Sequence, residues 1–453
     1  MTLMDFRSAP PLLKGPTLCD ELADVEKRLS RGHTNLEALR KLMDEDDRLL
    51  RQWANVLAAP SSTSTHAHAC RTRSLNARLC EDSNATFGGS QPPRQHASTT
   101  WEAWMAELWL HETSVADCTR FEQFHALDWN PRLFGWTSFQ NPSRLWADYM
   151  RLRLSPADAK IVDAAAARPF GPATWPLFNC SNGLQCWRDP ADGNATQSLT
   201  LRAESVLMAT NLDILQRSTG LDLRSLSLLV EFGGGTGQLA LVAKAAGMRD
   251  ALHVVYDLTP MGLSQRYWLR RAGLGAYMVP SEWPYSLLAG VGSGAPGSSL
   301  AAGRVALVSS TSPEVNQELL PRLLRGVGDS AGVDAAAGGG SLFVATWSFS
   351  ESSLSAREAI RPLLGSFDRL LIRFRDSFDK LDNRGYLRAL VTNDLARTHS
   401  VCVWNRMVLA VRSSSGGARC LTQLGCTAAS VDGSLRSRGV LACVAPNGTV
   451  LLK

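Results

Sequence analysis

Alternating apolar and polar runs divide the second half of the chain into short strands and helices. Strands are expected where apolar residues follow one another, and helices where they recur every three or four positions. The expected strands are 227–232, 252–256, 276–279, 305–309, 342–346, 370–374 and 401–411, and the expected helices are 201–220, 238–246, 260–272, 313–327 and 355–364. This alternation predicts an α/β fold with a mainly parallel, doubly wound sheet.

The first 57 residues follow the pattern of two amphipathic helices. The apolar residues of the first helix repeat at helical spacing, at Leu18, Leu22, Val25 and Leu29. Gly32-His33 interrupts the pattern, and Thr34 with Glu37 has the spacing of a capping box that opens the second helix. A helical hairpin on the core is the preferred interpretation, and a coiled-coil stem is the alternative.

Changes in composition set the expected domain limits. After the helical segment 1–57, residues 58–100 are rich in Ser, Thr, Pro and His and indicate a flexible linker or loop. Residues 101–196 form a Trp-rich, mainly helical region, whose aromatic side chains either pack in a core or line a glycan surface. The α/β domain occupies 197–415, with loop insertions at 289–303 and 328–340, and a Cys-containing tail covers 416–453.

Composition and charge exclude several classes of protein. Lys and Arg number 47 against 42 Asp and Glu, a net charge of +5 without any basic block, so no nucleic-acid partner is expected. A hydrophobic content of 45% excludes a wholly disordered chain. We find no apolar stretch of about 18 residues, and therefore expect no membrane span. The oligomeric state does not follow from these data.

The ten cysteines and four glycosylation sequons bear on the compartment. Three close cysteine pairs, Cys70/Cys80, Cys180/Cys186 and Cys420/Cys426, are compatible with disulfides in an oxidising lumen. The sequons begin at Asn84, Asn179, Asn194 and Asn447. The first residues do not resemble a signal peptide. We expect a glycoprotein of the secretory pathway or Golgi lumen whose anchor lies upstream, with a cytoplasmic protein as the alternative.

One glycine-rich segment carries cofactor chemistry. It runs from Val230 to Ala240 between an expected strand and an expected helix, with glycines at 233, 234, 235 and 237. Glycines here permit a tight turn and close approach of a ligand to the backbone. Asp257 ends the next strand, 20 positions past Gly237, where a carboxylate can accept hydrogen bonds from both ribose hydroxyls of a nucleoside cofactor.

The position of the acid Glu231 separates two cofactor classes. A dinucleotide site requires Gly-x-Gly-x-x-Gly, and this chain has Gln238 at the last position. An acid before the glycines would also repel a pyrophosphate. The pattern acid-x-Gly-x-Gly-x-Gly instead resembles motif I of class I S-adenosylmethionine (SAM) methyltransferases. The resemblance implies a Rossmann-like methyltransferase sheet at 197–415, preceded by the mainly helical N-terminal extension, with SAM as cofactor.

The following segment resembles the putative sugar O-methyltransferase family. Tyr256-Asp257-Leu258-Thr259-Pro260 is similar to its DLP-type turn, and Gln265-Arg266-Tyr267-Trp268-Leu269 to its Gln-x-Tyr-Tyr-Leu helix, with departures at Thr259 and Trp268. The resemblance implies methyl transfer to a sugar or glycan hydroxyl. It also implies a set of cofactor-binding residues: Glu231, Gly233, Gly234, Gly235, Gly237, Asp257, Leu258, Glu282 and Thr311.

The acceptor side is less defined. We expect the segment 309–314, after the strand 305–309, to face the transferred methyl group, with 346–348 nearby, and 281–283 to meet the adenine. A sugar hydroxyl requires a base or a metal. The catalytic residue is not identified, and the candidate bases are His111, His125, His399 and Glu314. Asp376, Asp379 and Asp382 could bind a divalent metal, but a solvated loop is the preferred interpretation, so no metal site is predicted.

Two alternatives to a sugar O-methyltransferase remain. One is a methyltransferase for another small molecule or a protein, and the other is a non-enzymatic glycan-binding luminal protein.

Overall fold

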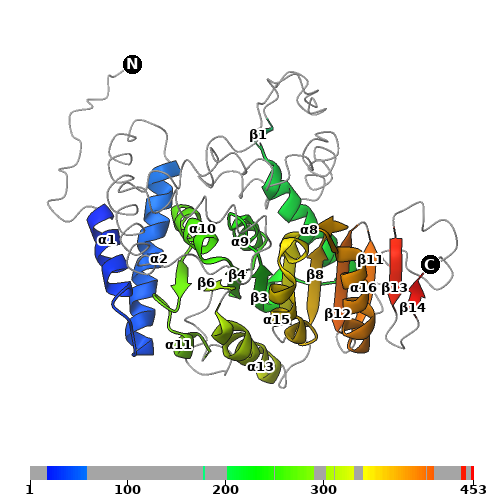
Figure 1. Cartoon of the computed structure of the whole chain (residues 1–453). Helices are drawn as coiled ribbons and strands as arrows, with labels where there is room; N and C mark the ends of the chain where they lie inside the picture. Colours follow the sequence, from blue (N-terminus) through cyan, green and yellow to red (C-terminus); the bar gives the residue numbers. More distant parts are fainter. Residues whose placement is uncertain are drawn as a thin grey trace, which may run out of the picture.

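The computed structural model describes most of the α/β domain and the N-terminal hairpin. The described residues are 18–58, 177–178, 201–248, 250–289, 303–310, 312–330, 340–404, 406–412, 440–444 and 450–452. They form a central sheet with helices on both of its faces (Figure 1). The predicted α/β class is therefore confirmed.

The central sheet has ten strands, in the order β14-β13-β11-β12-β8-β7-β3-β4-β6-β5. In chain order they are β3 (Leu226–Phe232), β4 (Leu252–Asp257), β5 (Ala276–Val279), β6 (Val305–Ser309), β7 (Gly340–Thr346), β8 (Arg369–Arg373), β11 (His399–Trp404), β12 (Met407–Arg412), β13 (Val440–Val444) and β14 (Val450–Leu452). Along the sheet, all neighbouring strands between β5 and β8 pair in parallel. Strand β12 pairs antiparallel with β8, and the remaining neighbours out to β14 also pair antiparallel. Two small two-stranded sheets lie apart, β1 (Leu177–Phe178) with β2 (Leu201–Arg202) and β9 (Ser377–Phe378) with β10 (Leu381–Asp382).

The order of the parallel strands fixes where a ligand can bind. Apart from β5, the parallel strands in chain order are β3, β4, β6, β7 and β8. In the sheet these five strands stand in the order 3-2-1-4-5, which is the doubly wound order. The order reverses between β3 and β7. In open α/β sheets, ligands bind outside the carboxyl ends of the strands at such a switch point. The glycine-rich segment follows β3 directly and lies at this point.

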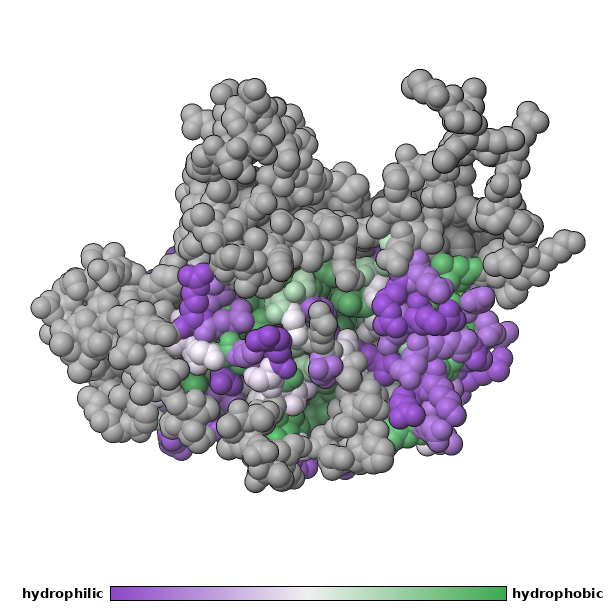
Figure 2. Space-filling model, turned by 180° about the vertical axis from the view of Figure 1, so that it is seen from behind, coloured by the Kyte–Doolittle hydropathy of each residue, from purple (hydrophilic) through white to green (hydrophobic). Residues whose placement is uncertain are grey.

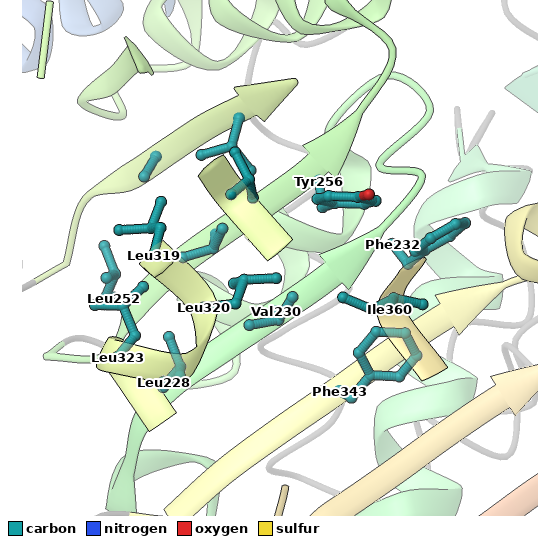
Figure 3. Close-up of a cluster of buried hydrophobic side chains, with 14 of the residues drawn as sticks. Leu228, Val230, Phe232, Leu252, Tyr256, Leu319, Leu320, Leu323, Phe343 and Ile360 are labelled. Carbon is teal, nitrogen blue, oxygen red and sulfur yellow. The ribbon is translucent and has the colours of Figure 1, made fainter. Parts of the chain in front are cut away.

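Alternating side chains of the strands face two different helical layers. Leu228, Val230 and Phe232 of β3 lie beside residues of the π-helix η7 (Val315–Leu319) and the helices α13 (Leu320–Ser330) and α15 (Leu354–Leu364) (Figure 3). The same cluster includes residues of α11 (Tyr285–Ala289), α14 (Ser348–Glu351) and α16 (Asn383–Asn393). The other face packs on α8 (Ala203–Thr219), α9 (Gln238–Ala245) and α10 (Thr259–Arg271). Two 3-10 turns, η5 (Leu223–Ser225) and η8 (Leu395–Arg397), precede β3 and β11.

The N-terminal hairpin belongs to the same core as the sheet. Its helices α1 (Leu18–Leu29) and α2 (Leu36–Ala58) bury Leu22, Val25 and Leu50 in the cluster that contains the residues of β3 and β4. The opposite side of the hairpin is charged, in keeping with the hydrophilic surface at this end of the molecule (Figure 2). This two-faced pattern confirms the predicted hairpin on the core.

The start of α2 differs from the predicted capping box. The side chain of Asn35 accepts hydrogen bonds from the backbone N–H groups of Glu37 and Ala38, at 2.9 and 3.2 Å. Asn35 is therefore the N-cap, one residue after the expected Thr34. An asparagine side chain at this position satisfies the free N–H groups of the first turn as well as a threonine does.

Several features of the fold were not predicted. Residues 401–411 form two antiparallel strands, β11 and β12, because the chain reverses direction between Trp404 and Met407. The helix α16 was not expected, and the helix expected at 313–327 begins as the π-helix η7. Strands β13 and β14 lie past residue 415, so the sheet continues into the segment predicted to be a tail.

Several predictions lie outside the described residues. These are the linker at 58–100, the Trp-rich region apart from Leu177 and Phe178, the four sequons, and the three close cysteine pairs. Most of the two predicted loop insertions, 289–303 and 328–340, also lies outside. No helix among the described residues is long and apolar enough to cross a membrane.

Candidate functional site

The glycine-rich turn requires glycine for two separate reasons. Gly233, Gly235 and Gly237 have φ angles of 71°, 55° and 84°, in the left-handed region where other residues are strained. Gly234 lies in a tight place instead, because a Cβ atom there would lie 2.4 Å from Val255 Cγ1. The turn is closed by a hydrogen bond of 2.8 Å from Gly237 N to Gly234 O. Its conformation thus depends on the alternating glycines that the sequence shows.

Asp257 lies beside this turn at the carboxyl end of β4. Its Oδ1 accepts a hydrogen bond from the backbone N–H of Leu258 at 2.7 Å, and its Oδ2 accepts one from Gln265 Nε2 at 2.7 Å. The backbone N–H of Gly235 also hydrogen-bonds to the carboxylate. Burial is the main cause that nevertheless raises the pKa of Asp257 to about 7, with a smaller contribution from Glu231 when that group is ionised. The group therefore changes charge near neutral pH.

The number of protein donors limits what Asp257 can hold. A carboxylate has about four acceptor positions, and the protein donors occupy three of them. Asp257 is only half-buried, so part of the residue is open to solvent. This geometry has room for one ligand hydroxyl where the sequence suggested two.

Glu231 is the last residue but one of β3, and by the alternation along the strand its side chain shares the face of Leu229, which packs against α8 and α9. Its side chain is 2% exposed, and its Oε2 lies 3.0 Å from Nε2 of His253 on the neighbouring strand β4. Burial raises the pKa of Glu231 to about 8 and holds the pKa of His253 well below its usual value. At neutral pH the two groups therefore form a neutral, hydrogen-bonded pair.

The carboxyl end of β7 lies against the turn on its other side. The Ser348 hydroxyl donates a hydrogen bond to the carbonyl oxygen of Phe232, the last residue of β3. A Cβ atom on Gly233 would lie 2.1 Å from Ser348 Cβ, so the two backbones are in close contact. The preceding Trp347 has a φ of 68°, which is rare for a tryptophan and costs about 1–3 kcal/mol. Such strain often marks a functional segment.

The strand order changes the expected roles of the segments that follow β5 and β6. Because β6 pairs with β4 and not with β3, Ser309 and Ser310 lie next to Asp257, away from β7. The segment beside the glycine-rich turn is therefore the one that follows β7, rather than 309–314. Thr311, predicted to bind the cofactor, lies outside the described residues.

Glu282 has a structural partner in place of the expected adenine contact. It is 4% exposed and forms two hydrogen bonds with the Arg266 guanidinium, at 2.5 and 2.9 Å. Its Oε2 also accepts a hydrogen bond from Met278 N at 2.8 Å. The neighbouring Trp283 is fully buried in the core. Both oxygens of Glu282 are thus engaged within the protein.

The candidate bases are not gathered at this site. His399 begins β11 at the edge of the sheet opposite the glycine-rich turn, and its Nε2 bonds the carbonyl oxygen of Phe367 at 2.7 Å. Burial lowers the pKa of His399. Glu314 is exposed, and a hydrogen bond from Ser312 lowers its pKa. His111 and His125 lie outside the described residues.

The acidic residues considered for a metal have other partners. Asp376 bonds Arg384 and Arg406, and Asp382 caps α16 through the N–H of Gly385. Among the described residues, no group of three or more His, Cys, Asp or Glu side chains could hold a metal ion.

The sequence did not predict that two polar residues, His253 and Gln265, belong to the site. His253 is hidden in a strand of apolar residues, where a single histidine carries no signal of its own. Gln265 stands in the motif on α10, and its spacing of eight from Asp257 could have indicated that it faces the same turn.

Comparisons of the chain with protein-family models, with curated proteins and with solved structures found no match.

Proposed function

We propose that the chain is a SAM-dependent methyltransferase that transfers a methyl group to a sugar or glycan hydroxyl. The observation that carries the proposal is the turn Gly233–Gly237 at the switch point of the sheet, with the half-buried carboxylate of Asp257 beside it. A glycine-rich turn at this place allows a ligand to approach the backbone, and an acid at the next strand end suits a ribose. The motif resemblance adds the acceptor class.

The residues present fit a nucleoside cofactor. Asp257 has one acceptor position left for a ribose hydroxyl, and the half-buried Gly233 and Gly235 have no side chains to block the approach. Glu231 is neutral at pH 7 because of its raised pKa, so its charge does not select between a cationic and an anionic ligand. The preference for SAM over a dinucleotide therefore rests on Gln238, which bonds Ser205 of α8 where a dinucleotide site has glycine.

The chain's own groups position the reactants. SAM, held by the turn and Asp257, would supply a methyl group on a positively charged sulfur: as the acceptor oxygen takes the methyl carbon, the sulfur would leave as a neutral thioether and the hydroxyl proton would pass to solvent. The turn and Asp257 orient the nucleoside, while Trp347 and Ser348 border the place where the strand order reverses. Alignment of this kind accounts for much of the rate in such a displacement.

Two measurements test the proposal. Calorimetry compares the binding of SAM, S-adenosylhomocysteine and NAD by the full chain, and we expect binding of the first two only. Transfer of a labelled methyl group from SAM is then measured on a panel of sugars and glycans, with peptides and small phenols as the alternative acceptors. Binding of NAD without SAM would overturn the cofactor. Transfer to peptides alone would retain the cofactor and overturn the acceptor.

A further inference from the structure

Gln265 of α10 connects the glycine-rich turn to Asp257. Its Nε2 donates hydrogen bonds to the carbonyl oxygen of Gly235 at 2.9 Å and to Asp257 Oδ2 at 2.7 Å, and the side chain is fully buried. Both partners are acceptors, so the amide nitrogen must face them and the orientation of the amide is fixed. One side chain thus sets the distance between the turn and the acid.

The same amide is one of two side chains that crowd Gly234 of the turn. A Cβ atom on Gly234 would lie 3.1 Å from Gln265 Nε2 and 2.4 Å from Val255 Cγ1. Val255 and Gln265 together therefore occupy the space that any other residue at position 234 would need. The middle glycine of the motif and the glutamine eight residues past Asp257 are parts of one packing arrangement.

Stability alone does not account for a glutamine here. Gln265 Oε1 is buried and has no hydrogen-bond partner among the described residues. A buried acceptor without a partner destabilises the fold, a cost that an apolar side chain of similar volume would avoid. The residue thus carries a cost that its contacts with Gly235 and Asp257 must offset, and those contacts lie in the candidate site.

From this geometry we infer that Gln265 is a positioning residue of the cofactor site, which holds the turn and orients the Asp257 carboxylate toward the ribose. The inference rests on the proposed function. Its physical basis is that Gln265 donates to the ionised form of Asp257 and thereby favours it. The other groups that face this carboxylate are the N–H groups of Leu258 and Gly235, which also favour ionisation, and Glu231, which opposes it.

The test measures the affinity of the full chain for S-adenosylhomocysteine by calorimetry between about pH 6 and pH 9. In Gln265→Met the volume is kept and the donor is lost. We expect its dissociation constant to rise about tenfold at neutral pH, because Asp257 is then less ionised and less well oriented, which weakens its charge-assisted hydrogen bond to the ribose. We also expect the pH at which affinity falls to move upward, because Asp257 ionises at higher pH without the donor.

A variant on the same helix serves as the control. Tyr267 packs edge to face on Trp268, with ring centroids 5.0 Å apart, and lies two residues from Gln265. Tyr267→Phe should leave both the affinity and its pH profile unchanged. If Gln265→Met does not fold, Gln265→Asn keeps a buried amide one methylene too short to reach both acceptors, and the same two changes are expected.

The possible outcomes separate the two proposals. Binding by the wild type, with an unchanged affinity and pH profile in the Gln265 variants, would overturn the positioning role and leave the proposed function intact. Absence of binding by the wild type at every pH would instead overturn the proposed function, and the inference with it. A tenfold loss without any shift of the pH profile would contradict the role of Gln265 in orienting the charged carboxylate.

Discussion

Arg270 in α10 and Asp46 in α2 form a buried ion pair with two contacts of 2.6 and 2.8 Å, although 224 residues separate them in the chain. Neither side chain is exposed to solvent. Glu26 of α1 lies 3.0 Å from the same guanidinium, and the Tyr277 hydroxyl donates to Asp46 at 3.0 Å. This network joins the N-terminal hairpin to the edge of the sheet at β5.

Removing Asp46 should therefore destabilise the whole protein. We expect Asp46→Ala to lower the free energy of unfolding by about 3–5 kcal/mol, because it leaves the Arg270 charge buried without its main partner. Urea denaturation measures this change. The matched control is Lys41→Ala, which removes an exposed pair with Glu37 on the same helix and should have no measurable effect. An equal, small effect of both variants would show that the network does not hold the hairpin.

Glu231→Gln distinguishes a direct contact of Glu231 with the cofactor from a structural role in the buried pair with His253. Because the pKa of Glu231 is about 8 and its partner is His253, the neutral amide replaces a group that is already neutral at pH 7. We expect the dissociation constant for SAM to change less than about threefold. A contact with the cationic amino group of SAM would instead give a loss of about tenfold or more. Calorimetry at pH 7 decides between the two.

The same pair makes the stability of the ligand-free protein depend on pH. A carboxyl whose pKa is raised in the folded state stabilises the fold while protonated, and this contribution is lost as the pH rises through the folded pKa. For Glu231 the loss extends up to about pH 8. We expect the unfolding free energy to fall between about pH 7.5 and pH 8, where His253 is largely neutral in both states because the pH lies well above its ordinary pKa of about 6.5. Glu231→Gln should make this profile flatter, and an unchanged slope would contradict the raised pKa.

Asp257→Ala tests the number of hydrogen bonds to the cofactor. Since one acceptor position is free, we expect a loss of SAM affinity of about 1.5–3 kcal/mol, the value of one charge-assisted hydrogen bond. The exposed Asp250, before the same strand, supplies the control, and Asp250→Ala should bind SAM normally. A loss twice as large would indicate two bonds to ribose hydroxyls, as the sequence alone suggested.

The contact between Gly233 and Ser348 predicts a steric effect that can be separated from backbone strain. Gly233 and Gly32 have nearly equal φ angles, 71° and 74°, but nothing lies within 4 Å of a Cβ atom on Gly32. Gly32→Ala should cost only about 1–2 kcal/mol of stability from the left-handed backbone. Gly233→Ala should cost about 1–3 kcal/mol more because of overpacking, and the second substitution Ser348→Gly should restore that difference. Thermal unfolding of the three variants checks this order.

Local patterns in the sequence predicted most of the elements that position the site. The apolar run before Gly233 and the repeat after Gly237 indicate a buried strand and a helix, and both are present. The neighbours of each strand could not be predicted in the same way. Strand β5 occupies the edge of the sheet, so β6 takes the place beside β4, and the segment after β7 becomes the one next to the turn.

Side-chain partners far apart in sequence explain the remaining differences. Glu282 follows an expected strand, as an adenine-binding acid would, but the fold brings Arg266 to it and buries both. Nothing in the local sequence distinguishes an acid that binds a ligand from one that forms an ion pair with an arginine 16 residues away. The pairing of Glu231 with His253 depends in the same way on the parallel register of β3 and β4.

The shared core of hairpin and sheet has a consequence for synthesis of the chain. The hairpin leaves the ribosome before the sheet does, and its partner Arg270 is made 224 residues after Asp46. At about 5–20 residues per second, that delay is roughly 10 to 45 seconds. During this time Leu22, Val25 and Leu50 have no sheet to cover them, and the charged network is incomplete. The apolar face of the hairpin therefore offers a chaperone a binding surface for as long as the sheet is unfinished.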